Sequence, residues 1–139
     1  MPQYALVREP GTQYAHCISS HPLHHTVNIT RARAQHAAYT NTLAELGIEI
    51  IRLFRDDKHP DACFVEDTAV IYGGKALIGR LAKNSRRGDE DSVEEALQEY
   101  LPVKRILAPG TLEGGDVIQL PTESLVESVS EPTGQVLHR

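Results

Sequence analysis

The stretch AVIYGGKALI, residues 69–78, decides the fold of this chain. Two largely apolar runs flank Gly73-Gly74, and a glycine pair allows the positive φ angles of a primed turn, so the stretch predicts a β-hairpin. A charged loop follows, and apolar residues then recur at helical spacing, at Val93, Ala96, Leu97, Tyr100 and Leu101. Pro102 ends this helix, and residues 103–107 predict the next strand.

A strand–helix–strand unit is predicted before the hairpin. Residues 4–7 predict a short strand, and from about Thr30 the pattern is helical, with one face formed by Tyr39, Leu43 and Leu46. Asn28 or Thr30 suits the N-cap of this helix, and Gly47 suits a left-handed position after its end. Residues 48–53 predict the strand that follows.

The two units and a strand at residues 117–120, which opens a third, predict an α/β chain of repeated small strand–helix–strand modules. We take residues 1–120 as one partial domain. Residues 121–139 contain no aromatic residue and only scattered apolar pairs. They predict a tail that is disordered.

Composition narrows the classes of function. Of 139 residues, 40% are hydrophobic and 24% are charged, as in an ordinary globular protein, and the net charge of −5 disfavours nucleic acid as a partner. No apolar run approaches the ~20 residues of a membrane span. The N-terminus lacks the pattern of a signal peptide, and Cys17 and Cys63 lack disulfide or metal spacing, so we expect a cytoplasmic protein.

An acidic run, DACFVEDTAV at residues 61–70, is the first candidate for chemistry. It places Asp61, Glu66 and Asp67 beside a β-type stretch. Paired carboxylates accept parallel N–H bonds from a planar guanidinium, the strongest kind of charge-assisted recognition. The alternative is a solvated turn before a strand, which is the commoner role of charge runs.

Two further motifs carry charge. In APGTLEGGDV, residues 108–117, Glu113 and Asp116 flank a glycine pair that permits close backbone approach, so the carboxylates could orient a histidine or bind a cation. The alternative is a turn with polar flanks. In NSRRG, residues 84–88, the arginines could bind an anion such as a substrate carboxylate, or could form a solvated basic loop.

No residue stands out as a nucleophile or a metal ligand. Cys63 lies between Asp61 and Glu66, whose negative charge disfavours a thiolate, and Cys17 lies in an irregular loop. The histidines of the same loop, His21, His24 and His25, lack the spacing of a zinc site. We therefore predict no metal and no cofactor.

Together these motifs resemble those of the dimethylarginine dimethylaminohydrolases, of the guanidine-modifying pentein superfamily. The carriers are PDACFVED at 60–67, SRRG at 85–88 and APGTLEGGD at 108–116, in family order, with AQHAAY at 34–39 on the first helix. The resemblance covers about residues 1–120. It implies a propeller of five small αβ modules, of which this chain would be the N-terminal half, and an early end through truncation, a frameshift or a gene-model error.

The resemblance also implies an activity: hydrolysis of methylated arginine to citrulline and a methylamine by a cysteine thiolate that attacks the guanidinium carbon. The residues that match the family pattern are Asp61, Glu66 and Asp67 for the guanidinium and amino end, Arg86 for the substrate carboxylate, Ile18 on a loop near the substrate, and Glu113 in support of the catalytic histidine. The family's nucleophilic cysteine and catalytic histidine find no match, so we expect this chain alone to be inactive.

Three other functions remain open. The chain could belong to a relative that acts on arginine or agmatine and releases ammonia, to a non-catalytic guanidinium-binding module, or to an inactive fragment. In each active case the partner is a small guanidino compound. Exposed module faces would favour self-association into a homo-oligomer.

Overall fold

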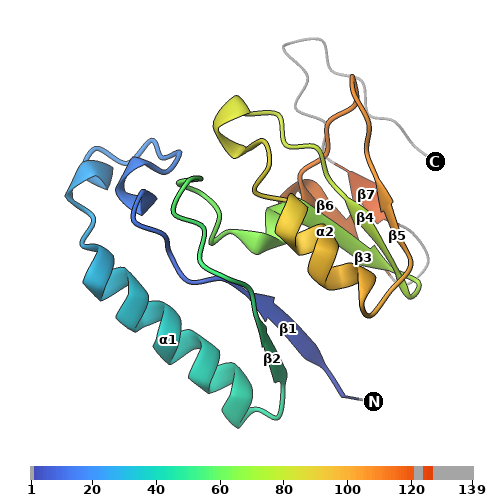
Figure 1. Cartoon of the computed structure of the whole chain (residues 1–139), viewed down its shortest axis with the longest axis horizontal. Helices are drawn as coiled ribbons and strands as arrows, with labels where there is room; N and C mark the ends of the chain where they lie inside the picture. The colour runs from blue at the N-terminus through green and yellow to red at the C-terminus, as the bar shows by residue number, and fades with distance from the viewer. Residues whose placement is uncertain (1, 121–123, 127–139) are drawn as a thin grey trace.

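The computed structural model of the chain describes residues 2–120 and 124–126, which form two successive α/β units followed by a pair of strands (Figure 1). The first unit consists of β1 (Tyr4–Val7), α1 (Ile29–Glu45) and β2 (Glu49–Arg52). The second consists of β3 (Ala69–Tyr72), β4 (Lys75–Ile78), α2 (Asp91–Gln98) and β5 (Val103–Arg105). The pair of strands consists of β6 (Val117–Gln119) and β7 (Ser124–Val126). Short 3-10 helices in the connections are η1 (Tyr14–His16), η2 (His24–Thr26), η3 (Val65–Thr68), η4 (Asn84–Arg86) and η5 (Gly114–Asp116).

Each unit has its own small sheet among the described residues. Strands β1 and β2 pair in parallel, β4 pairs with β3 antiparallel and with β5 in parallel, and β6 pairs with β7 antiparallel. Figure 1 shows α1 beside β1 and β2 at one end of the molecule, and α2 beside the β3–β4–β5 sheet at the other. The predicted order of strand–helix–strand and hairpin–helix–strand units is therefore confirmed. The propeller arrangement stays a prediction.

Local signals in the sequence fix several element boundaries as predicted. Gly73 and Gly74 have φ angles of 56° and 72°, as a primed hairpin turn requires. Asn28 caps α1, because its side chain accepts the backbone N–H of Arg31 at 2.9 Å. Gly47 has a φ of 83° directly after the C-cap of α1.

The core lies between the second sheet and α2. Its buried side chains are Ala76, Ile78, Val93 and Leu97. Leu6 and Leu53 of the first unit pack against this cluster, so both units share one core. Full burial of a branched aliphatic side chain contributes ~1.5–3 kcal/mol.

Three predictions about the elements are corrected. On the predicted face of α1, Tyr39 and Leu46 are exposed and Leu43 is half-buried, while Thr40 on the neighbouring face is the buried residue of that helix. Helix α2 ends at Gln98, so Tyr100 lies beyond it, half-exposed, with its ring 5.8 Å from that of Tyr4. The strand predicted at 103–107 ends at Arg105.

The tail predicted to be disordered contains one strand in the structure. Residues 124–126 form β7 and pair with β6, where the sequence favours disorder throughout 121–139. The other residues of that tail lie outside the described residues. Within the described residues, no helix has both the length and the apolar character needed to cross a bilayer.

Candidate functional site

A pocket of about 350 Å³ brings together five of the six residues that the sequence predicts for a substrate site. Its lining comes from the loop after η1, from η3 and the residues before it, from η4 and the residue before it, and from the residue before η5. The lining residues are Ile18, Asp61, Phe64, Asp67, Lys83, Arg86 and Glu113. Motifs separated by tens of residues in sequence therefore meet at one surface.

Arg86 is the centre of the pocket's charge network. Its Nη1 donates to Asp67 Oδ2 at 2.6 Å, its Nε donates to Asp89 Oδ2 at 3.1 Å, and its Nη2 reaches the carbonyl oxygens of Asp61 and Phe64. The residue is 4% exposed, so the alternative of a solvated basic loop fails for this arginine. Burial lowers the pKa of Arg86, but Asp67 and Asp89 outweigh that effect and raise it. The guanidinium stays charged and mostly engaged by the protein.

Asp67 presents a carboxylate that is only partly used. Its side chain is 28% exposed, and its Oδ2 accepts the hydrogen bond from Arg86 Nη1. Oδ1 lies beside Gly115, where a Cβ would come within 2.5 Å of it. Gly114 is similarly confined, since a Cβ there would meet the carbonyl oxygens of Glu66 and Ala69. The glycine pair therefore serves close approach of η5 to η3, and neither glycine has a positive φ.

The other two acids of the pocket hold loops in place. Asp61 is buried, and both of its carboxylate oxygens accept the backbone N–H of Ile18, at 3.0 and 3.2 Å. Glu113 accepts the N–H of Ala82 at 3.3 Å through Oε1. The acidic run is therefore more than a solvated turn. Asp61 fixes the loop that carries Ile18, and Glu113 fixes the segment before η4.

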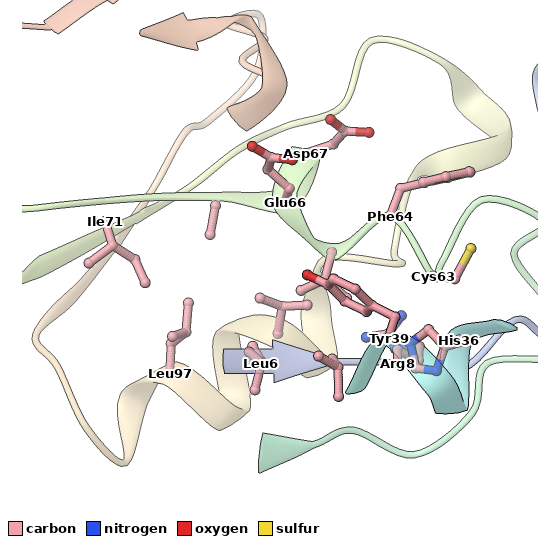
Figure 2. Close-up of a pocket in the computed structure, with 14 residues that line it drawn as sticks. Leu6, Arg8, His36, Tyr39, Cys63, Phe64, Glu66, Asp67, Ile71 and Leu97 are labelled. Atoms are coloured by element: carbon pink, nitrogen blue, oxygen red, sulfur yellow. The ribbon is translucent and has the colours of Figure 1, made fainter. Parts of the chain in front are cut away.

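Glu66 does not join the other predicted residues. It is exposed and lines a neighbouring pocket of about 410 Å³, which shares Phe64 and Asp67 with the first. Figure 2 shows that pocket and the carboxylates of Glu66 and Asp67, which point to the same side, away from Leu6 and Leu97. Asp67 thus lies on the wall between the two pockets, with Glu66 on the far side.

The surroundings of both cysteines raise the pKa of their thiols. Burial, reinforced by Cys17, raises the pKa of the Cys63 thiol to about 11. Burial and the charge of Asp61 raise the pKa of Cys17. Neither thiol forms a thiolate readily at neutral pH, in keeping with the electrostatic argument from the sequence. Among the described residues, no three His, Cys, Asp or Glu side chains are grouped as a metal site requires.

Sequence reasoning missed two residues of the pocket. Phe64 supplies an exposed aromatic face, and Lys83 supplies a second, exposed positive charge beside Arg86. Lys83 lies directly before the NSRRG motif, and that position is the signal that could have found it. Phe64 lies inside the acidic run, whose pattern indicates a role for its carboxylates and not for its aromatic residue.

Comparisons with known proteins match this chain to one family. The family model described as N,N dimethylarginine dimethylhydrolase, eukaryotic, matches residues 2–125. The N(G),N(G)-dimethylarginine dimethylaminohydrolase of Pseudomonas aeruginosa is 39% identical over 92 residues, which cover 65% of this chain and 36% of that protein. The enzyme of the same name from Streptomyces coelicolor is 37% identical over 117 residues, or 84% of this chain and 45% of the relative.

Solved structures show the same likeness. A mutant of the P. aeruginosa enzyme in complex with citrulline superimposes with a TM-score of 0.85 at 32% identity, over 91% of this chain and 50% of that one. Unliganded AgrE matches with a TM-score of 0.73 at 19% identity, over 83% of this chain and 18% of its own, and shows the fold alone. The chain spans at most about half the length of these relatives. The shared architecture is that of the α/β penteins.

Proposed function

Since this chain belongs to the dimethylarginine dimethylaminohydrolase family, we propose that it carries the guanidinium-binding part of a methylarginine hydrolase site. The observation that supports this most directly is the pocket that joins Ile18, Asp61, Asp67, Arg86 and Glu113. Its acids and bases provide complementary partners for an amino acid with a cationic end and a carboxylate.

In this proposal Asp67 accepts the guanidinium N–H groups of the substrate. Oδ1 receives no hydrogen bond from the described residues, and the side chain is open to the pocket. Glu66 adds a second negative charge across the wall that Asp67 forms. A charge-assisted bond of this kind is worth ~1.5–3 kcal/mol.

The carboxylate end of the substrate would meet Arg86 and Lys83. Arg86 uses most of its N–H groups on Asp67, Asp89 and two carbonyl oxygens, so the exposed Lys83 supplies a further positive charge to the pocket. Ile18 would cover the ligand from the loop that Asp61 holds, and Glu113 would orient a histidine of the complete site.

The chemical step of the proposed reaction needs a thiolate that attacks the guanidinium carbon and expels a methylamine, after which water releases citrulline. Burial raises the pKa of Cys63 to about 11, and burial with the charge of Asp61 raises the pKa of Cys17, so both environments disfavour the thiolate that this role needs. In this proposal no described residue of the chain serves as the nucleophile or as its histidine. The propeller, the cytoplasmic location and self-association through exposed side chains such as Phe54 and Leu107 belong to the same proposal.

Calorimetric titration of the chain with N(G),N(G)-dimethylarginine tests this function. Asp67→Asn keeps the size of the side chain and removes its charge, so we expect the dissociation constant to rise by roughly 10- to 100-fold. Glu45→Gln, at the exposed end of α1, is the matched control and should bind like the unmodified chain. Equal affinity in all three proteins would refute the pocket as the guanidinium site.

A further inference from the structure

The turn that carries Arg86 into α2 is held by the first unit of the fold. Residues 87–90 form this turn, and Asp89 within it is fully buried. Arg8, directly after β1, donates from Nη1 and Nη2 to the carbonyl oxygen of Asp89, at 3.3 and 3.4 Å, and from Nη2 to Ser92 Oγ at 2.5 Å. Arg8, a buried arginine of the first unit, therefore holds the backbone three residues after Arg86.

His59, in the connection between β2 and η3, provides a second tie. It is buried, its Nδ1 lies 2.7 Å from Asp56 Oδ2, and its Nε2 lies 3.0 Å from the carbonyl oxygen of Arg87. A carboxylate and a carbonyl only accept hydrogen bonds, so the tautomer of the ring decides which of its two nitrogens donates. Asp56 is itself fixed, since Oδ1 accepts the backbone N–H groups of Lys58 and His59.

The backbone of the turn is shaped to fit this ring. Gly88 has a φ of 99°, and a Cβ there would come within 3.4 Å of His59 Nε2. The N–H of Gly88 is held from the other side by Glu90 Oε2 at 2.8 Å. The His59 ring, Gly88 and the buried Glu90 together fix the position of this turn relative to η4.

We propose that His59, oriented by Asp56, is a positioning residue that fixes the turn at residues 87–90 and thereby the direction of the Arg86 guanidinium. The importance of that direction rests on the proposed function, because Arg86 meets Asp67 in the substrate pocket. The connection after β2 in this way sets the direction in which the second unit presents its buried arginine, while the loop between β1 and α1 supplies Ile18 to the pocket wall.

The test uses two readouts on the 139-residue chain. Nitrogen-15 NMR follows hydrogen exchange of the Arg86 Nε–H group, assigned with Arg86→Lys, and calorimetry follows the affinity for dimethylarginine. In His59→Phe, which keeps a ring and loses both ring-nitrogen contacts, we expect exchange to quicken by at least about tenfold and affinity to fall by about tenfold. His59→Gln keeps a donor for the Arg87 carbonyl and should recover part of both.

The control is His25→Phe, an exposed histidine of η2 outside the pocket, which should change neither readout. Unchanged Arg86 exchange in a folded His59→Phe chain would overturn the proposal. If His59→Phe does not fold, Asp56→Asn decides, because loss of the carboxylate charge should shift both ring-nitrogen signals of His59 and quicken Arg86 exchange, and unchanged signals overturn it. Absence of dimethylarginine binding in the unmodified chain refutes the proposed function alone, since the exchange readout needs no ligand.

Discussion

Asp89→Asn should change how the stability of this protein depends on pH. The Asp89 side chain has no exposed surface, and its Oδ1 has no hydrogen-bond partner among the described residues. Burial raises the pKa of Asp89 from its ordinary 3.8 to about 6, assisted by the neighbouring charge of Glu90 and opposed by Arg86 and His59. The cost of removing this carboxylate from water thus exceeds what its ion pair with Arg86 returns.

The sign and size of the effect follow from that shift. A pKa raised by about two units corresponds to roughly 3 kcal/mol between the protonated and charged forms. Because the folded state favours the protonated form, the contribution of Asp89 to the free energy of unfolding is fully present below about pH 4. It is lost as the pH rises through about 6. Asparagine does not titrate, so the unfolding free energy of the unmodified chain minus that of Asp89→Asn should fall by about 3 kcal/mol from pH 3 to pH 8.

Urea unfolding followed by circular dichroism, repeated at half-unit steps of pH, measures this difference. Glu95→Gln, an exposed acid on α2, is the matched control, and its difference from the unmodified chain should stay within about 0.5 kcal/mol at every pH. A difference for Asp89→Asn that is independent of pH, or that grows as the pH rises, would refute the claim that burial dominates at this carboxylate.

Two further predictions concern the glycine pair and the cysteines. Gly114→Ala should lower the free energy of unfolding by about 1–3 kcal/mol, because the added Cβ would lie 2.7 Å from the carbonyl oxygen of Ala69. A thermal transition no lower than that of the unmodified chain would contradict the close packing of η5 on η3. The 139-residue chain should release no citrulline from dimethylarginine in a colorimetric assay, because Cys63 has a pKa raised to about 11 and Cys17 a raised one. Citrulline that disappears in Cys63→Ala or Cys17→Ala would show that this part of the chain holds a nucleophile.

The sequence by itself determined those features that a few neighbouring residues control. Gly73 and Gly74 bend the hairpin, Asn28 starts α1 and Gly47 follows its end, because φ angles and first-turn hydrogen bonds depend on residues within one turn of each other. The order of the motifs also placed Asp61, Asp67 and Arg86 in one site through the resemblance to a family. Periodicity could show which side chains of α1 share a face, but not that the sheet would cover the face of Thr40 and leave Tyr39 exposed.

Only the tertiary structure decided how the charges are used. Arg86 lies 19 residues from Asp67 in sequence, and Arg8 lies 81 residues from Asp89, so no local sequence pattern predicts either contact. The same holds for Gly114, whose lack of a side chain matters because η3 packs against it. Burial and ion pairing depend on which distant segments meet, and the energy of a charge depends on the water it loses there. For that reason the three carboxylates of one acidic run have different roles. Asp61 is buried and holds the loop of Ile18, Asp67 is partly exposed in the pocket, and Glu66 lines the neighbouring pocket.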